Sequence, residues 1–322
     1  MGLKGDAGYW VGGEKPWVQN ARCGISDGQG GIVRAPHSSD PRTPDLRFTI
    51  SNTSPVILIT GASSGLGWAL AQEMARRGWS TRLVARRADR LQEAVDTLTS
   101  RYSQAAHAAL ALDLADPDAP QRCIDWLNSW GDWPEVVVHN AGLGRFGRWE
   151  AVPWDIHQSI LAVQVRSVVA LTGTLLGPML QRGRGMFVFV GSTSGRKPVP
   201  FLATYAASKA FLHQWALALG EELRGTAVRS LLVIPGFIGT GFHERGGLPA
   251  EVQPARSQPL ETVARRVADA IEGRRGGVLV VGRWRERLTG WLQRLFPGER
   301  WAVRMGRFYE RWLPPVSGED RG

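Results

Sequence analysis

The stretch VILITGASSGLG, from Val56 to Gly67, joins a short apolar run to a turn with three glycines and two serines. The continuous apolar run is typical of a strand buried on both faces, and the residues after the turn follow a helical pattern. A glycine turn between a strand and a helix lets the backbone approach a pyrophosphate, because free N–H groups and the helix dipole meet its charge. A glycine turn without a ligand is the alternative, but this position, at the first strand-helix junction, favours dinucleotide binding.

Six more short apolar runs follow along the chain, and helix-like segments separate most of them. The runs are Thr81–Ala85, Ala108–Leu112, Glu135–His139, Met186–Val190, Val228–Ile234 and Gly277–Val281. Strands and helices that alternate in this way imply right-handed crossovers and a parallel sheet with helices on both faces. We therefore predict a doubly wound, Rossmann-like α/β domain over residues 55–282.

Composition limits what lies outside this domain. Residues 1–54 are rich in Gly, Pro, Ser and Asp without a sustained period, which indicates a loose tail or a mis-assigned start codon. The longest apolar region, residues 160–180, contains Gln164 and Arg166, so we do not expect it to cross a membrane. With no secretory signal pattern and two distant cysteines, Cys23 and Cys123, we expect a cytoplasmic protein in a reducing compartment.

The net charge of +10 raises the question of an anionic partner. The excess comes from scattered arginines, 35 of them against four lysines, and not from a basic block with interleaved aromatic residues. Because no nucleic-acid-binding motif accompanies them, we expect no nucleic-acid partner. Six histidines are present, none at a metal-ligand spacing, and we expect no metal site. His139 is interpreted as a strand-end residue next to Asn140 and His213 as a packing residue of the helix after Tyr205, and neither is assigned a role.

One of the few lysines, Lys209, follows Tyr205 by four residues in the stretch TYAASKAFLHQW. On a helix this spacing puts both side chains on one face. At an effective dielectric near 20 and about 5 Å, the ammonium would favour phenolate by roughly 3 kcal/mol, or about two pKa units. Ser192 follows the run Met186–Val190, and a residue at the carboxyl end of a parallel strand faces the ligand crevice. There its hydroxyl could hold a substrate carbonyl beside the tyrosine.

These motifs together resemble the short-chain dehydrogenase/reductase family from about Val56 to Gly282. The fingerprint T-G-x-x-x-G-x-G fits Thr60, Gly61, Gly65 and Gly67, and the catalytic pattern fits Ser192, Tyr205 and Lys209. The resemblance implies catalysis by these three residues. It also implies a cofactor site that contains Gly61, Ser63, Ser64, Gly65, Leu66, Gly67, Asp113, Leu114, Asn140, Ala141, Gly142, Tyr205, Lys209, Pro235, Gly236 and Thr240. By this resemblance Asp113 would meet the adenine, and the segment from Pro235 to Thr240 would border the nicotinamide.

Charge predicts which nicotinamide cofactor is bound. An NAD site uses Asp or Glu at the end of the second strand for the ribose hydroxyls, whereas this chain has Arg86 and Arg87 there. Because arginine grips phosphate through charge-assisted hydrogen bonds, we predict NADP(H), with Arg86 on the 2′-phosphate and Arg87 as the weaker candidate. The alternative is that both are ordinary solvated arginines at the start of a helix.

One residue departs from the family pattern. Gln164 stands where the resemblance places a catalytic asparagine, whose role is to help anchor a water that links the lysine to solvent. Glutamine carries the same amide one methylene further out. It therefore either still holds this water or alters the proton path between the lysine and solvent. We include Gln164 in the predicted catalytic set.

The last part of the chain, residues 283–322, is basic and rich in tryptophan. Apolar residues recur there at helical spacing in two sets: Trp284, Leu288, Trp291 and Leu295, then Trp301, Met305, Phe308 and Trp312. A helical pair over the substrate cleft or at a subunit interface, a helix bound peripherally at a membrane surface, and an unordered tail are the three interpretations.

The sequence predicts an oxidoreductase that transfers a hydride between NADP(H) and a carbonyl or alcohol carbon of a small molecule. The aromatic tail favours a hydrophobic ketone or aldehyde as the substrate, and we expect a homodimer or homotetramer. A NADP-binding protein without turnover is the alternative, because Gln164 replaces the family's asparagine.

Overall fold

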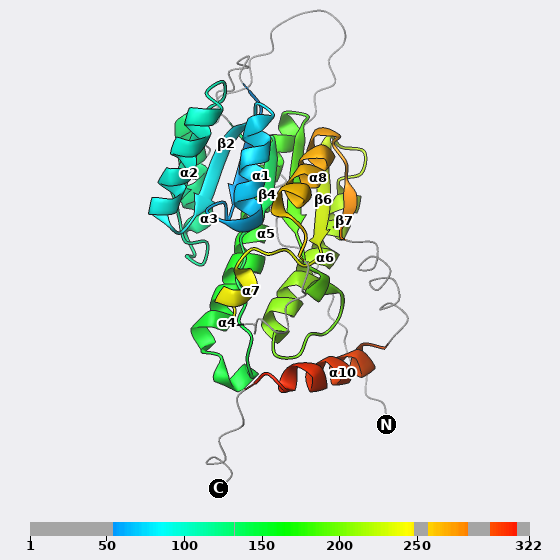
Figure 1. Ribbon diagram of the computed structural model, residues 1–322. Coiled ribbons are helices and arrows are strands. Elements are labelled where there is room, and N and C mark those ends of the chain that lie inside the picture. The colour runs from blue at the N-terminus through cyan, green and yellow to red at the C-terminus, as the bar shows by residue number, and fades with distance from the viewer. Residues whose placement is uncertain (1–53, 132, 248–256, 283–296, 314–322) are drawn as a thin grey trace, which may run out of the picture. The chain divides into compact units, whose positions relative to one another are not determined.

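The computed structural model describes residues 54–131, 133–247, 257–282 and 297–313. In this part of the chain, seven strands form one parallel sheet in the order β3-β2-β1-β4-β5-β6-β7 (Figure 1). They are β1 (Val56–Thr60), β2 (Ser80–Ala85), β3 (His107–Ala111), β4 (Val136–His139), β5 (Gly185–Val190), β6 (Val228–Pro235) and β7 (Gly277–Val281). Each predicted apolar run agrees with a strand to within one residue at either end, and the predicted doubly wound α/β class is confirmed.

Helices cover both faces of the sheet. One face carries α1 (Gly65–Arg76), α2 (Ala88–Arg101) and α8 (Leu260–Glu272), and the other carries α3 (Ala119–Trp130), α5 (Ser167–Gln181) and α6 (Ala203–Glu222). Successive side chains of a strand point to opposite faces, so Ile57 and Ile59 join the first core while Leu58 joins the second. Burial on both faces is the reason that the strands read as continuous apolar runs.

One long helical run could be mistaken for a membrane span. Residues Trp154–Gln181 combine α4 (Trp154–Leu161), a π-helical turn η2 (Ala162–Arg166) and α5, and by length and a hydropathy of 1.6 they could cross a bilayer. In the domain, however, Leu171, Leu175 and Met179 of this run are fully buried under the sheet. It is therefore positioned as a core helix.

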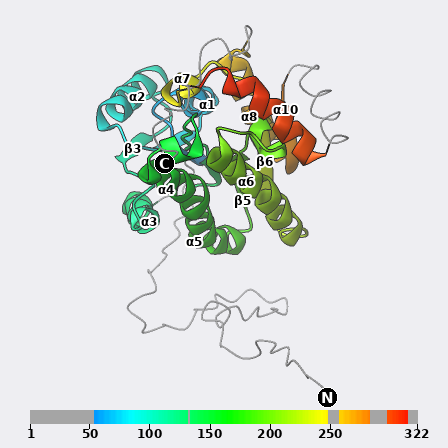
Figure 2. The same ribbon diagram turned by 90° about the horizontal axis from the view of Figure 1, so that it is seen from below.

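The carboxyl edge of the sheet carries the short elements of the fold. These are η1 (Trp149–Ala151), η3 (Thr193–Arg196) and α7 (Phe242–Arg245), and α10 (Gly298–Glu310) lies across the same edge (Figure 2). At this edge β1 neighbours β4, and the chain winds outward from the pair in both directions. A ligand crevice is expected at such a switch point, outside the carboxyl ends of the strands.

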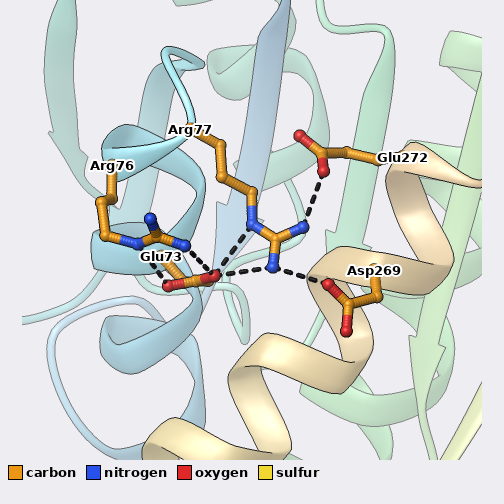
Figure 3. Close-up of polar contacts among 5 residues, drawn as sticks. All are labelled: Glu73, Arg76, Arg77, Asp269 and Glu272. Atoms are coloured by element: carbon orange, nitrogen blue, oxygen red, sulfur yellow. Dashed lines mark hydrogen bonds and ion pairs between the residues drawn. The ribbon is translucent and has the colours of Figure 1, made fainter.

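An arginine at the end of α1 fastens this helix to α8 (Figure 3). The Arg77 side chain, only 13% exposed, donates hydrogen bonds to Glu73, to Asp269 at 2.7 Å and to Glu272 at 2.6 Å. Arg76 and Arg77 together hold the pKa of Glu73 at about 2, against the opposing effect of burial. Such a network contributes about 2 kcal/mol, and it fixes the helix whose other end forms the glycine turn.

Two predicted segments fall largely or partly outside the described residues. Residues 1–53 of the expected tail and residues 283–296 of the C-terminal extension are among those that the structure does not describe. The second half of the extension contains α10, whose apolar positions match the helical spacing read from the sequence.

Candidate active site

A cavity of about 540 Å³ opens at the carboxyl edge of the sheet. It reaches from Arg86 and Arg87, after β2, to Tyr309 on α10. Of the predicted site residues, the cavity is lined by Gly61, Ser63, Ser64, Gly65, Leu66, Arg86, Arg87, Asp113, Leu114, Asn140, Ala141, Gly142, Gln164, Ser192, Tyr205, Lys209, Pro235, Gly236 and Thr240. Gly67 is buried and is not part of this lining, so the structure gathers all but one of the predicted residues in one place.

The glycine turn is held against the end of β4. Gly61 has φ +68, and a Cβ at Gly67 would lie 2.5 Å from the Asn140 side chain, so neither position accepts a larger residue without a shift. Asn140 Nδ2 donates to the carbonyl oxygens of Thr60 at 2.9 Å and of Gly61 at 3.2 Å. These hydrogen bonds hold the glycine turn against the Asn140 turn at the edge of the cavity.

Two arginines border the turn from the β2 side. Arg87 donates from one nitrogen to the hydroxyls of Ser63 and Ser64, at 3.1 Å each. Arg86 lies 3.8 Å from a carboxylate oxygen of Asp113, and both side chains are exposed. Ser64 is the N-cap of α1 but makes no side-chain cap hydrogen bond, which leaves the first N–H groups of the helix facing the cavity. The arrangement concentrates positive potential beside the serines.

Tyr205 and Ser192 meet at the other end of the cavity. Tyr205 lies in the first turn of α6, and Ser192 is the N-cap of η3 just beyond β5. Burial raises the pKa of the Tyr205 phenol above its ordinary value, while a hydrogen bond with the Ser192 side chain lowers it. The phenol is consequently a protonated group at neutral pH.

Lys209 lies one turn further along α6 and shares this burial. Its Nζ donates to the Val190 carbonyl oxygen at 2.8 Å and lies 5.9 Å from the centroid of the Tyr205 ring. Burial lowers the pKa of the Lys209 amine to about 8. The prediction that the resting phenol is acidified overall is therefore wrong, because burial raises the pKa of Tyr205 more than its neighbours lower it; a positive charge on Lys209 still favours the phenolate relative to a site without that charge.

Gln164 sits in the π-helical turn and is fully buried. Ser208 gives its only proton to the Tyr205 carbonyl oxygen at 2.8 Å, so it must accept the 2.9 Å hydrogen bond from Gln164 Nε2. This fixes the amide orientation and directs Oε1 toward Gly142. Oε1 has no hydrogen-bond partner in the described part of the chain. It and Lys209 Nζ lie 2.6 Å and 3.6 Å from the point where a Cβ of Gly142 would stand.

His213 supports the serine, a contact that the sequence analysis missed. Its Nε2 accepts a 3.4 Å hydrogen bond from the Ser192 backbone N–H, and burial lowers its pKa to about 4, so the ring stays neutral. A Cβ at Gly191 would lie 2.5 Å from the same ring. The spacing of eight residues after Tyr205, two helical turns, was the available signal.

Aromatic residues enclose the end of the cavity beside Tyr205. The Phe242 ring of α7 lies 5.3 Å from the Tyr205 ring, and Tyr309 of α10 packs edge-on against Phe146 at 5.6 Å. Leu202 also lines this end. The sequence indicated a hydrophobic substrate only through the aromatic character of the extension, and it did not identify these residues.

Comparisons with known proteins agree with the fold and the cleft. A family model described as short chain dehydrogenase matches residues 55–247. Sulfoacetaldehyde reductase 2 of Chromohalobacter salexigens is 36% identical over 192 residues, which cover 59% of this chain and 75% of that protein.

Two solved structures resemble this one at slightly lower identity. Serine dehydrogenase complexed with NADP+ superposes with a TM-score of 0.63 at 26% identity, over 70% of this chain and 94% of the other. L-Sorbose reductase from Gluconobacter frateurii, complexed with NADPH and L-sorbose, has a TM-score of 0.63 at 25% identity, over 71% and 95%. The family match includes every cavity residue except Tyr309, and the chain therefore belongs to the short-chain dehydrogenase family.

Proposed function

We propose that this protein is an NADP(H)-dependent reductase that transfers a hydride to the carbonyl carbon of a hydrophobic ketone or aldehyde. The observation that carries the proposal is the pairing of Tyr205 with Ser192, in one cavity with Lys209 and the glycine turn. Sulfoacetaldehyde reductase 2, serine dehydrogenase and L-sorbose reductase are relatives whose names describe carbonyl or alcohol chemistry, which supports the reaction class.

The residues of the cavity fit a dinucleotide. A Cβ at Gly61 or Gly67 would stand 2.8 Å or less from a neighbouring atom, so these positions need glycine, and the α1 N-terminus offers free N–H groups to a pyrophosphate. Asp113, which the resemblance assigns to the adenine, lines the cavity beside Arg86, and Thr240 lines it next to Gly65 of the turn. When bound there, NADP(H) would supply the hydride.

The basic border favours NADP(H) over NAD(H). A 2′-phosphate beside β2 would meet Arg86 and Arg87, and the Ser63 and Ser64 hydroxyls lie within the reach of Arg87. Arg86 has a carboxylate neighbour in Asp113, whereas Arg87 points at hydroxyls, so Arg87 is at least as strong a candidate. The complexes of serine dehydrogenase with NADP+ and L-sorbose reductase with NADPH support this choice.

The chain's own residues supply the proton. Ser192 would donate a hydrogen bond to the carbonyl oxygen of the substrate and hold it beside Tyr205. Because burial keeps the Tyr205 phenol protonated, it can give its proton to that oxygen as the hydride arrives. Lys209 then stabilises the phenolate through its charge, and the Gln164 amide oxygen lies beside the ammonium.

The alternative of a binding protein without turnover rested on Gln164. Its amide oxygen occupies the cavity wall beside Lys209, with the orientation set by Ser208, so the replacement retains an acceptor at this place. The substrate end is lined by Phe146, Phe242 and Tyr309, which supports a hydrophobic substrate.

Replacing Tyr205 by Phe tests the proposed reaction. We expect NADPH oxidation, followed by absorbance with a panel of aryl and alkyl ketones and aldehydes, to fall at least ~100-fold, because the proton donor is lost. NADPH affinity should change little. Tyr102→Phe is the matched control, since Tyr102 is a half-buried tyrosine outside the cavity. Equal rates for Tyr205→Phe and the wild type would rule out the mechanism.

Replacing Gln164 by Leu tests whether the Gln164 amide supports the charge of Lys209 during proton transfer. The reduction rate of the wild type should fall above about pH 8, because Lys209, with its pKa lowered to about 8, then loses the charge that stabilises phenolate. The Leu variant lacks the amide dipole that stabilises the ammonium. The pH at which the rate has fallen by half should therefore be lower in this variant, and kcat should be reduced roughly tenfold. Gln164→Asn keeps an amide and should restore most of kcat. If the rate of Gln164→Leu depended on pH as the wild-type rate does, the amide would not be supporting the Lys209 ammonium.

Replacing Arg86 and Arg87 by Asp, one at a time, tests the cofactor preference. Each change should lower kcat/KM for NADPH at least ~10-fold and leave that for NADH nearly constant or higher, because a carboxylate repels the 2′-phosphate. Arg90→Asp is the control, since Arg90 pairs with Glu93 on the exposed side of α2. If the ratio of kcat/KM for NADPH to that for NADH were the same in both variants as in the wild type, neither arginine would bind the 2′-phosphate.

Replacing Tyr309 by Ala tests the substrate end. The ratio of kcat/KM for a bulky aryl ketone to that for a small ketone should change about tenfold, because the cavity loses one aromatic wall. KM for NADPH should stay constant. Trp312→Ala removes an exposed aromatic ring just past the same helix and should leave the ratio unchanged. Equal effects of the two variants would show that Tyr309 does not select the substrate.

A further inference from the structure

We propose that the outer face of α10 docks the protein on a membrane surface that contains anionic phospholipids. The inner face of this helix rests on the domain. A Cβ at Gly298 would stand 3.8 Å from Pro198, a Cβ at Gly306 would stand 3.7 Å from Pro200, and Tyr309 enters the cavity. Glu310 pairs with Arg148 at 3.6 Å, next to η1. The helix therefore has a fixed inner side and a free outer side.

The outer side carries an arginine stripe, which consists of Arg300, Arg304, Arg307 and Arg311. These positions follow one another at intervals of four, three and four residues, so the guanidinium groups line one face of the helix. Among the residues that the structure describes, the stripe has no ion-pair or hydrogen-bond partner for its side chains. Four cations remain available for anionic groups outside the molecule.

Apolar side chains stand among these arginines. Val303 is 56% exposed and Phe308 is 43% exposed, and both line the same shallow groove as the stripe. Trp312, just past the helix, is 39% exposed. A helix with arginines around exposed apolar and aromatic residues suits the boundary between phospholipid headgroups and acyl chains, where each kind of side chain has a partner.

Charge complementarity decides the kind of partner. The chain carries a net charge of +10, and the stripe adds a local excess of positive charge to an outward-facing helix. A nucleic acid would match the charge but would leave Val303 unpartnered. A second copy of this chain would match the apolar residues but would bring two arginine stripes together. An anionic phospholipid surface matches both.

Docking on α10 would place the proposed substrate end of the cavity close to the acyl chains. Tyr309, on the inner side of the same helix, lines that end, and Figures 1 and 2 show α10 across the carboxyl edge where the cavity opens. This consequence rests on the proposed function, whereas the docking itself does not. Lipid binding and turnover can thus be tested separately.

The experiment is cosedimentation of the full chain with vesicles. One set contains equal parts phosphatidylglycerol and phosphatidylcholine, and the other contains phosphatidylcholine alone. We expect binding to the first set only, with a loss at high salt. The double substitution Arg304→Gln/Arg307→Gln should weaken it about 25-fold, at about fivefold for each arginine. The control pair is Arg265→Gln/Arg266→Gln on the exposed side of α8, which removes the same charge from a distant helix.

Each outcome is decisive for the docking face. Equal weakening by the two double variants would show that net charge alone drives binding, and absence of binding by the folded wild type would overturn the proposal. If light scattering showed that Arg304→Gln/Arg307→Gln changed the oligomeric state without changing vesicle binding, the face would be an interface between copies. Turnover of a water-soluble ketone should stay the same in all variants, so a failure of the proposed reaction would be seen independently.

Discussion

The site depends on the hydrogen bonds that join the ends of β1 and β4. Thr60 Oγ1 donates to the Val138 carbonyl oxygen at 3.1 Å and accepts the N–H groups of Asn140 and Ala141 at 3.0 and 3.1 Å. The Asn140 amide returns two hydrogen bonds to the glycine turn. These bonds satisfy backbone groups that the strands leave at the switch point, where ladder pairing stops. Because they fix the turn against β4, they set the place at which a dinucleotide can meet the residues beyond β5.

Burial governs the chemistry at the other end of the cavity. It pushes both Tyr205 and Lys209 toward their neutral forms, so the resting phenol is a proton donor and the amine has a pKa of about 8. The Lys209 ammonium, whose Nζ lies 5.9 Å from the centroid of the Tyr205 ring, would stabilise a phenolate through its charge. This attraction lowers the pKa of the phenol relative to a site without the ammonium, but burial keeps the net pKa above its ordinary value, so the phenol stays protonated at rest. The lysine therefore acts on the transition state more than on the resting tyrosine, which is the difference that accelerates a reaction. A pair that ionised the phenol at rest would serve oxidation better than reduction.

Local patterns explain what the sequence could predict. The strands are buried on both faces, so their apolar character does not depend on distant contacts, and the glycine turn needs particular backbone shapes that few residues allow. Side-chain contacts between segments that are far apart in the sequence could not be predicted from such local patterns. The amphipathic pattern of α10 predicted a helix with an apolar side but not that Tyr309 would meet Phe146, because the landing point of an extension depends on packing against Pro198 and Pro200. The pKa of Tyr205 was misjudged for a related reason, since desolvation arises from neighbours such as Phe242 that lie far along the chain.

The exchange of asparagine for glutamine at position 164 was the main departure from the family pattern, and its local setting explains how the longer side chain fits. The helix that carries it widens into a π turn at Ala162–Arg166, which changes the direction of the side chain relative to an α-helix. The Gln164 amide nitrogen donates a hydrogen bond to Ser208, and this contact orients the longer side chain so that it fits without a clash. The oxygen is left unpaired in a fully buried place, a costly state for a polar group. A fold retains such a cost where another group completes the site, and a water that bridges this oxygen and the Lys209 ammonium, which both lie near Gly142, would do so.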